Sequence, residues 1–144
     1  MTDLGMDTLD TAVQKTNVLL NDIAEDLGWE GRKHQVYNLL RATLHALRDR
    51  LPLEEAVHFG AQLPMIVRGF YYEGWNPSKV PVKMDRTAFL ERIRSEFIFD
   101  SDKSITELIK TALTHVFIHI NPEESLHLKD VLPEDLRDFV SLIP

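Results

Sequence analysis

The feature that most constrains the fold is a pattern of helical runs separated by prolines, and it occurs twice in the chain. In the first copy, Leu51-Pro52 and Leu63-Pro64 each stand between two runs of apolar residues with helical spacing. Proline disfavours the α conformation in the residue before it and fits the first turn of a helix. Each pair is therefore predicted to end one helix and to open the next.

Shifting the second half of the chain back by 69 residues aligns it with the first half. Leu44 then aligns with Leu113, and Arg68 aligns with Arg137. We therefore predict an all-α fold, a tandem duplication of a four-helix unit packed as one compact helical domain. Each unit is small enough to have a marginal core, so the two should pack face to face with approximate two-fold symmetry. An unrelated run of eight short helices is the alternative.

The predicted units are residues 11–74 and 85–143, joined by a proline-rich linker at 75–84. Residues up to about Leu9 are expected to be frayed. Thr11 with Gln14 forms a capping-box pattern, although Asp7 or Asp10 could cap the first helix instead. The strongest core stripe is on the second helix and consists of Val36, Leu40, Leu44, Leu47 and Leu51. The predicted helices are 11–27, 32–50, 53–61, 65–72, 86–97, 103–120, 122–130 and 134–142.

Composition excludes several functional classes. The chain has 144 residues, a formal net charge of −7 and no cysteine. An acidic domain is a poor match for a phosphate backbone, so nucleic acid is not expected as a partner. Without cysteine there are no disulfides or thiolate metal sites. No apolar run approaches the roughly 20 residues needed to span a bilayer, and the N-terminus lacks the basic and apolar regions of a signal peptide. We expect a cytoplasmic protein without membrane contact or cofactor.

A basic stripe on the second helix is the first candidate binding face. On a helical wheel, His34, Arg41, His45 and Arg48 fall within roughly 60° of one another, away from the core stripe. The second unit has Lys110, Phe117 and His119 where the first has Arg41, Arg48 and Arg50. This mostly uncharged counterpart indicates a role beyond building the unit. Arginine offers a planar fork for carboxylate or phosphate. The alternative is a solvated face with structural ion pairs.

Other residues extend this candidate face. Gln62 and Arg68 belong to the first unit, and the second unit has valine where Gln62 stands. Tyr and Trp are enriched at interface hot spots, although some aromatic residues at helical spacing must belong to the core. The aromatic candidates at the end of the fourth helix are Tyr71, Tyr72 and Trp75.

Metal binding and catalysis have weak support in the sequence. His115 and His119 are four residues apart, but no spacing fixes a third ligand, so we expect no metal site. Phosphate-loop, nucleotide-fold and nucleophile-elbow motifs are absent. We therefore expect that the protein is not an enzyme.

The chain resembles a known family in three segments, LRATLHALRDRLPLEEA, GAQLP and RGFYYEGWNPSKVP. These segments are similar to the signature of the bacterial and archaeal family named domain of unknown function 2267. The resemblance covers nearly the whole chain and implies an all-helical fold, but it implies no catalytic role.

The favoured function is a small helical binding or scaffold module that contacts a protein partner or forms a homo-oligomer. The first alternative is a binder of a small anionic ligand on the Arg41, His45 and Arg48 face. A histidine-dependent enzyme is the least favoured reading.

Overall fold

The computed structural model describes residues 2–140, and their side chains from residue 5 onward. This part of the chain forms helices joined by short loops and contains no strand, which confirms the predicted all-α class. In chain order the elements are α1 (Thr2–Leu27), α2 (Lys33–Arg50), α3 (Leu53–Gln62), α4 (Met65–Tyr72), η1 (Pro77–Lys79), α5 (Arg86–Glu96), α6 (Ile105–Ile118), α7 (Pro122–Val131) and η2 (Glu134–Val140).

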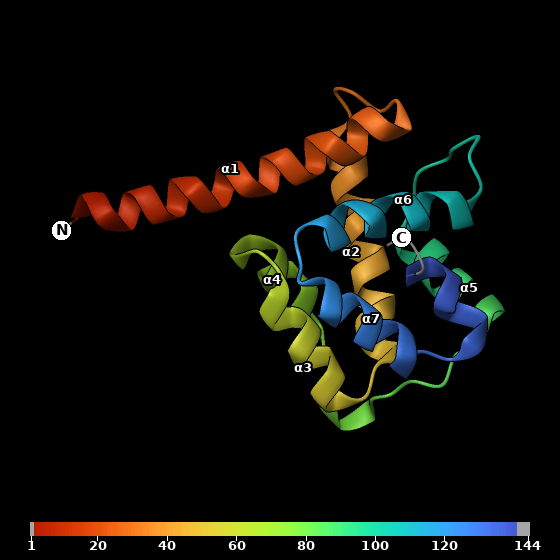
Figure 1. Cartoon of the computed structure of the whole chain (residues 1–144). Coiled ribbons are helices and arrows are strands. Elements are labelled where there is room, and N and C mark those ends of the chain that lie inside the picture. The colour runs from red at the N-terminus through yellow and green to blue at the C-terminus, as the bar shows by residue number, and fades with distance from the viewer. Residues whose placement is uncertain (1, 141–144) are drawn as a thin grey trace.

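Helix α2 is the centre of the molecule. It contacts α1, α4, α5 and α6, which surround it (Figure 1). The predicted stripe from Val36 to Leu51 is buried, and Leu44 has no exposed surface. In α6, Leu113 at the corresponding position is equally buried. Because α2 is covered on several sides, the polar residues Thr43, His45 and Arg48 are buried as well. On a helix that packs through one face only, they would be exposed to water.

Several helix boundaries follow the predicted signals. Asp85 accepts a hydrogen bond from the amide of Ala88 at the start of α5. Asn121 accepts one from Glu123 at the start of α7, directly before Pro122. Side-chain oxygens at these positions satisfy amides that have no partner within the helix. Gly28 ends α1 with a φ of 72°, a conformation that costs glycine nothing.

The N-terminal boundary was predicted wrongly. Helix α1 begins at Thr2 instead of residue 11, so Thr11 does not cap it. Its N-terminal half extends away from the body of the molecule (Figure 1). The apolar positions Met6, Leu9 and Val13 continue the three- and four-residue spacing of the core positions Leu20 and Ile23. The amphipathic pattern that defines the helix therefore starts earlier than the first capping signal.

Two features of the second half also differ from the prediction. The linker at 75–84 contains the short helix η1, and the amide of Val82 donates to the carbonyl of Asp49 at 2.7 Å. The predicted helix 134–142 is a 3-10 helix over Glu134–Val140, and its last residues lie outside the described part. The duplication and the boundaries of its units stay predictions. Within the described residues, no helix is long and apolar enough to cross a bilayer.

Candidate functional site

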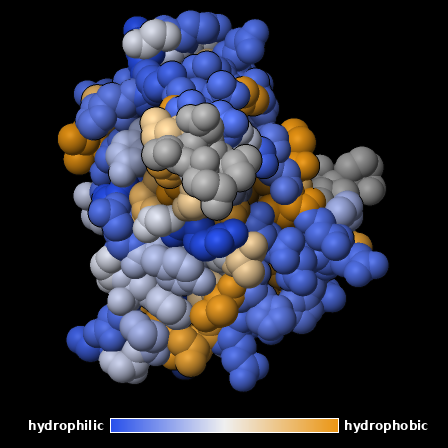
Figure 2. Space-filling model, turned by 90° about the vertical axis from the view of Figure 1, so that its left-hand side faces the viewer, coloured by the Kyte–Doolittle hydropathy of each residue, from blue (hydrophilic) through white to orange (hydrophobic). Residues whose placement is uncertain are grey.

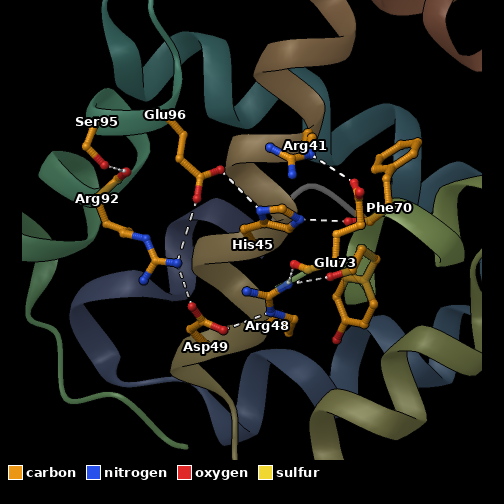
Figure 3. A network of polar contacts seen from close by, with 10 residues as sticks. Arg41, His45, Arg48, Asp49, Phe70, Glu73, Arg92, Ser95 and Glu96 are labelled. Atoms are coloured by element: carbon orange, nitrogen blue, oxygen red, sulfur yellow. Dashed lines mark hydrogen bonds and ion pairs between the residues drawn. The ribbon is translucent and has the colours of Figure 1, made fainter. Parts of the chain in front are cut away.

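Arg48 belongs to a polar network at the end of α4 (Figure 3). Its Nη1 donates to the carbonyls of Tyr71 and Glu73 at 2.8 and 2.7 Å, and its Nε donates to Asp49 at 2.8 Å. The last carbonyls of a helix have no partner inside it and carry partial negative charge. Arg48, which is 2% exposed, therefore closes the C-terminal end of α4 from inside the molecule.

His45 lies one turn earlier in α2 and joins two further elements. Its Nε2 is 2.7 Å from the carbonyl of Phe70, and its Nδ1 is 3.2 Å from Oε2 of Glu96 in α5. Both partners offer acceptor oxygens. His45 therefore links the end of α4 to α5 through its two ring nitrogens.

Carboxylates compensate these buried and half-buried cations. Arg92 bridges Asp49 at 2.6 Å and Glu96 at 3.7 Å, and Arg41 pairs with Glu73 at 3.2 Å. Burial by itself raises the pKa of Glu96. The hydrogen bond from His45 and the positive charges of His45, Arg92 and Arg41 outweigh this effect, so the pKa lies below its ordinary value. The network therefore holds α2, α4 and α5 together through paired charges.

The prediction that His45 and Arg48 belong to an exposed basic face is wrong. Both are buried, and their donors are directed at α4 and at neighbouring carboxylates. Of Arg41, His45 and Arg48, only Arg41 keeps part of its side chain at the surface, with 32% of the side chain exposed. The helical wheel separates these residues from the apolar stripe correctly, but it assumes that the other side of α2 faces water. That side is covered by α4 and α5.

Arg68 has the same kind of role at the end of α3. Its guanidinium donates to the carbonyls of Gly60, Ala61 and Leu63 at 2.9, 3.2 and 2.9 Å. Arg137, 69 residues later, donates to the carbonyl of Leu132, which is likewise 69 residues after Leu63. Corresponding arginines thus bind the carbonyls of corresponding leucines.

Gln62 and Arg68 nevertheless meet at the surface, in a cleft of about 630 Å³ between α1 and the corner that joins α3 to α4. Lys15 and His119 lie on the same cleft. The structure therefore brings these two predicted residues together and separates them from His45 and Arg48. The complete lining consists of Thr11, Gln14, Lys15, Val18, Leu19, Ala61, Gln62, Leu63, Pro64, Arg68 and His119.

The aromatic candidates are mainly packing residues. Tyr71 is fully buried, and its hydroxyl donates to the carbonyl of Ala56 at 2.7 Å. Burial, with Tyr72 beside it, raises the pKa of the Tyr71 phenol. Tyr72 lies half-buried between the rings of Tyr71 and Trp75. The indole N–H of Trp75 is buried and has no acceptor among the described residues.

His115 in α6 and His119 at its C-terminal end lie in different surroundings. His115 lies 2.9 Å from Asp26 of α1, whereas His119 lies at the end of α6 and lines the cleft. Within the described residues, no three histidine or carboxylate side chains gather as a possible metal site. His115 and His119 are four residues apart, but no third ligand accompanies them among the described residues.

An apolar surface that the sequence analysis did not predict lies on the projecting part of α1. We call residues 5–14 of this helix the overhang, and Met6, Leu9 and Val13 the overhang stripe. These three side chains are exposed by 53, 54 and 49%. At 100° per residue they lie within about 60° of one another, and Leu20 of the core falls in the same arc. The side of α1 that packs on the core at Leu20 is thus exposed in the overhang.

The apolar surface continues on the body beside the overhang. Met65 and Ile66, in the first turn of α4, are also exposed. Met65 lines a second cleft of about 440 Å³ together with Asp7, Thr8 and Ala12 of α1. Figure 2 looks at the molecule from the N-terminal end of α1, and hydrophobic residues gather near this helix tip and on the surface below it.

Acidic residues flank the overhang stripe on one side. On the helical wheel, Asp10 lies about 40° beyond Met6, and Asp7 about 100° beyond it in the same direction. Both are exposed, and neither forms an ion pair within the described residues. An acid in the first turn of a helix stabilises it through the helix dipole, but Asp7 and Asp10 lie beyond the first turn of α1. The overhang therefore offers an apolar stripe with an uncompensated negative flank.

Comparison with known proteins identifies a family but no activity. The family model described as an uncharacterized conserved protein (DUF2267) matches residues 16–139. The match begins at Thr16, so the whole overhang lies outside it. No curated protein matches the chain.

Proposed function

Because the chain belongs to the DUF2267 family, whose description assigns no activity, we propose its function from the described surface: it is a protein-binding module. The overhang stripe carries this proposal. Single exposed apolar residues are normal on soluble proteins. A regular stripe on a helix that projects from the body, beside exposed Met65 and Ile66, is instead typical of an interaction surface.

The spacing supports docking of a helix on this surface. Met6, Leu9 and Val13 are separated by three and four residues, as in the seam of two packed helices. Leu20, Ile23 and Leu27 continue the same spacing and pack α1 against the body. The overhang therefore exposes the same kind of apolar surface that the rest of α1 packs against the body. About three helical turns of a partner would match its length.

The polar network supports a binding role over a catalytic one. The buried side chains of His45 and Arg48 have structural partners at the end of α4. Bringing a substrate to them would require breaking those contacts. We therefore propose that this network keeps the scaffold rigid while α1 makes the contact.

The test is capture by the full chain from a cell extract, compared with a variant that carries Leu9→Gln and Val13→Gln. Glutamine keeps the helix and adds no charge. The matched control is Val57→Gln with Leu126→Gln, because these residues are similarly exposed on α3 and α7. The proposal predicts that the overhang variant loses the captured protein and that the control keeps it. Equal capture by both variants would contradict it.

A small anionic ligand is a second candidate function, and the cleft beside Gln62 favours it. The cleft has an apolar floor, and Lys15, Arg68 and His119 contribute positive or protonatable groups. Its volume is within the usual range of ligand sites. Titration calorimetry with citrate as the probe would test this site. Binding that is lost in Lys15→Ala with His119→Ala is the expected result, and no heat of binding to the wild type would exclude citrate-like ligands.

We also propose that the scaffold arose by duplication of a four-helix unit. The matching contacts of Arg68 and Arg137 with Leu63 and Leu132 support this idea. The second unit differs in its last element, where a 3-10 helix stands in the place of α4. Under this proposal residues 5–10 of the overhang lie before the first repeat.

A further inference from the structure

The overhang has a one-sided charge that restricts the kind of partner it fits, and this inference rests on the binding role proposed above. Asp7 and Asp10 are exposed on one flank of the stripe. No cation of the described residues neutralises them by an ion pair. Lys15, the nearest basic residue of the helix in sequence, lies about 150° from the centre of the stripe on the wheel and lines the two clefts, the second of which Asp7 also lines. An approaching helix would therefore meet an apolar seam with carboxylates along one edge.

We propose that the overhang binds an amphipathic helix whose apolar face is flanked by lysine or arginine. The apolar seam of that helix would cover Met6, Leu9 and Val13, and its basic residues would reach Asp7 and Asp10. Opposite charges beside a helical seam select the partner and its orientation. Complementary charge also increases the rate of association.

A second copy of this chain fits the same surface less well. The chain has a net charge of −7. Antiparallel pairing of two overhangs through their stripes would bring Asp7 and Asp10 of both copies to the same interface, and like charges there oppose association. Charge therefore favours a basic partner over a second copy of the chain.

The experiment uses the full chain and two synthetic helical peptides about three heptads long. Both peptides have leucine at the seam positions. One has lysine at every flanking position, and the other has glutamate there. Fluorescence anisotropy measures their affinity at about 0.05 M and about 0.5 M salt, where screening changes strongly. We expect the lysine peptide to bind at least about tenfold more tightly at low salt and to lose most of this preference at high salt.

Two variants assign this preference to the overhang. Asp7→Asn with Asp10→Asn should reduce the preference for the lysine peptide several-fold. Asp100→Asn with Asp102→Asn is the matched control, because these acids are exposed elsewhere and the change in net charge is the same. The control should keep the preference. Equal losses in both variants would show that only the overall charge matters and would overturn the proposal.

The proposed binding role and the basic partner can fail separately. If Leu9→Gln with Val13→Gln abolishes the binding of both peptides, and the two peptides bind equally well to the wild type, the stripe binds helices without regard to charge. That result keeps the binding role and removes the basic partner. If sedimentation shows a dimer of the wild type that this variant disrupts, a second copy occupies the stripe, which also overturns the inference. Peptide binding that the variant leaves unchanged would contradict both proposals.

Discussion

His45 and Arg48 act on backbone carbonyls at the end of α4, and this explains why a small protein buries two basic side chains. The carbonyls of Tyr71 and Glu73 receive N–H groups from Arg48, and His45 contacts the carbonyl of Phe70, which also accepts the amide of Glu73. Removing one partner of a buried charged contact leaves the other unsatisfied and costs about 3–5 kcal/mol. These side chains are therefore part of the structural frame of the first half.

The two contacts of His45 give a direct prediction for the residue scale. Its ring nitrogens lie within hydrogen-bonding distance of the carbonyl of Phe70 and the carboxylate of Glu96. Replacing His45 with alanine should lower the free energy of unfolding by about 1–3 kcal/mol, because these buried and half-buried acceptors lose a partner. Urea denaturation measures this loss, and the exposed His58 provides the control as His58→Ala. Equal losses in both variants would show that the contacts of His45 contribute nothing specific.

Glu96 should make stability depend on pH in the acidic range. Its pKa is lowered from the ordinary value of 4.5, so ionised Glu96 stabilises the folded state above that value. This contribution should disappear as the pH falls through the folded-state pKa. Urea unfolding of the wild type and Glu96→Gln should therefore differ at neutral pH and converge in acid. A difference that is constant from neutral pH into strong acid would contradict the assignment.

At the scale of the elements, α2 and α6 have corresponding buried leucines. Leu44 and Leu113 are both fully buried. Replacing either with alanine should lower the free energy of unfolding by about 2–5 kcal/mol, because each change leaves a cavity in the core. Chemical denaturation measures this loss. A loss below about 1 kcal/mol at one site would mean that the two helices do not have equivalent places in the core, which would weaken the duplication proposal.

The sequence predicted most helices because their signals are local. Prolines, caps and apolar spacing identify α2 to α7, and Leu44 and Leu113 lie where the pattern predicts. The candidate site was predicted less well. Whether His45 and Arg48 are exposed depends on α4 and α5, which are distant in sequence, and a helical wheel contains no such information. The spacing of Met6, Leu9 and Val13 indicates that the first helix includes the overhang, but the capping pattern at Thr11 favoured a start at residue 11.

At the scale of the whole molecule, zinc is not expected to stabilise the fold. His115 contacts Asp26, whereas His119 lines the cleft. A structural zinc ion usually requires four ligands. The melting temperature should therefore change little on addition of stoichiometric zinc. A rise of several degrees that disappears in His119→Ala would show a metal site formed by this histidine.

Residues that hold the fold and residues that we propose for binding lie in different parts of the molecule. Arg48 belongs to the first group, since it is buried and closes the end of α4. Leu9 belongs to the second, because it is exposed on a helix segment outside the body. The sequence alone suggests a different assignment, with a charged face that includes Arg48 as the binding surface and a frayed N-terminus up to about Leu9. The two assignments predict opposite results for a substitution at Arg48.

The most direct measurement is urea unfolding of Arg48→Ala and Leu9→Gln beside the wild type. The account predicts that Arg48→Ala lowers the free energy of unfolding by about 3–5 kcal/mol. It predicts a change within about 0.5 kcal/mol for Leu9→Gln, as for an ordinary surface position. Little change in Arg48→Ala together with a loss above about 1 kcal/mol in Leu9→Gln would contradict the account.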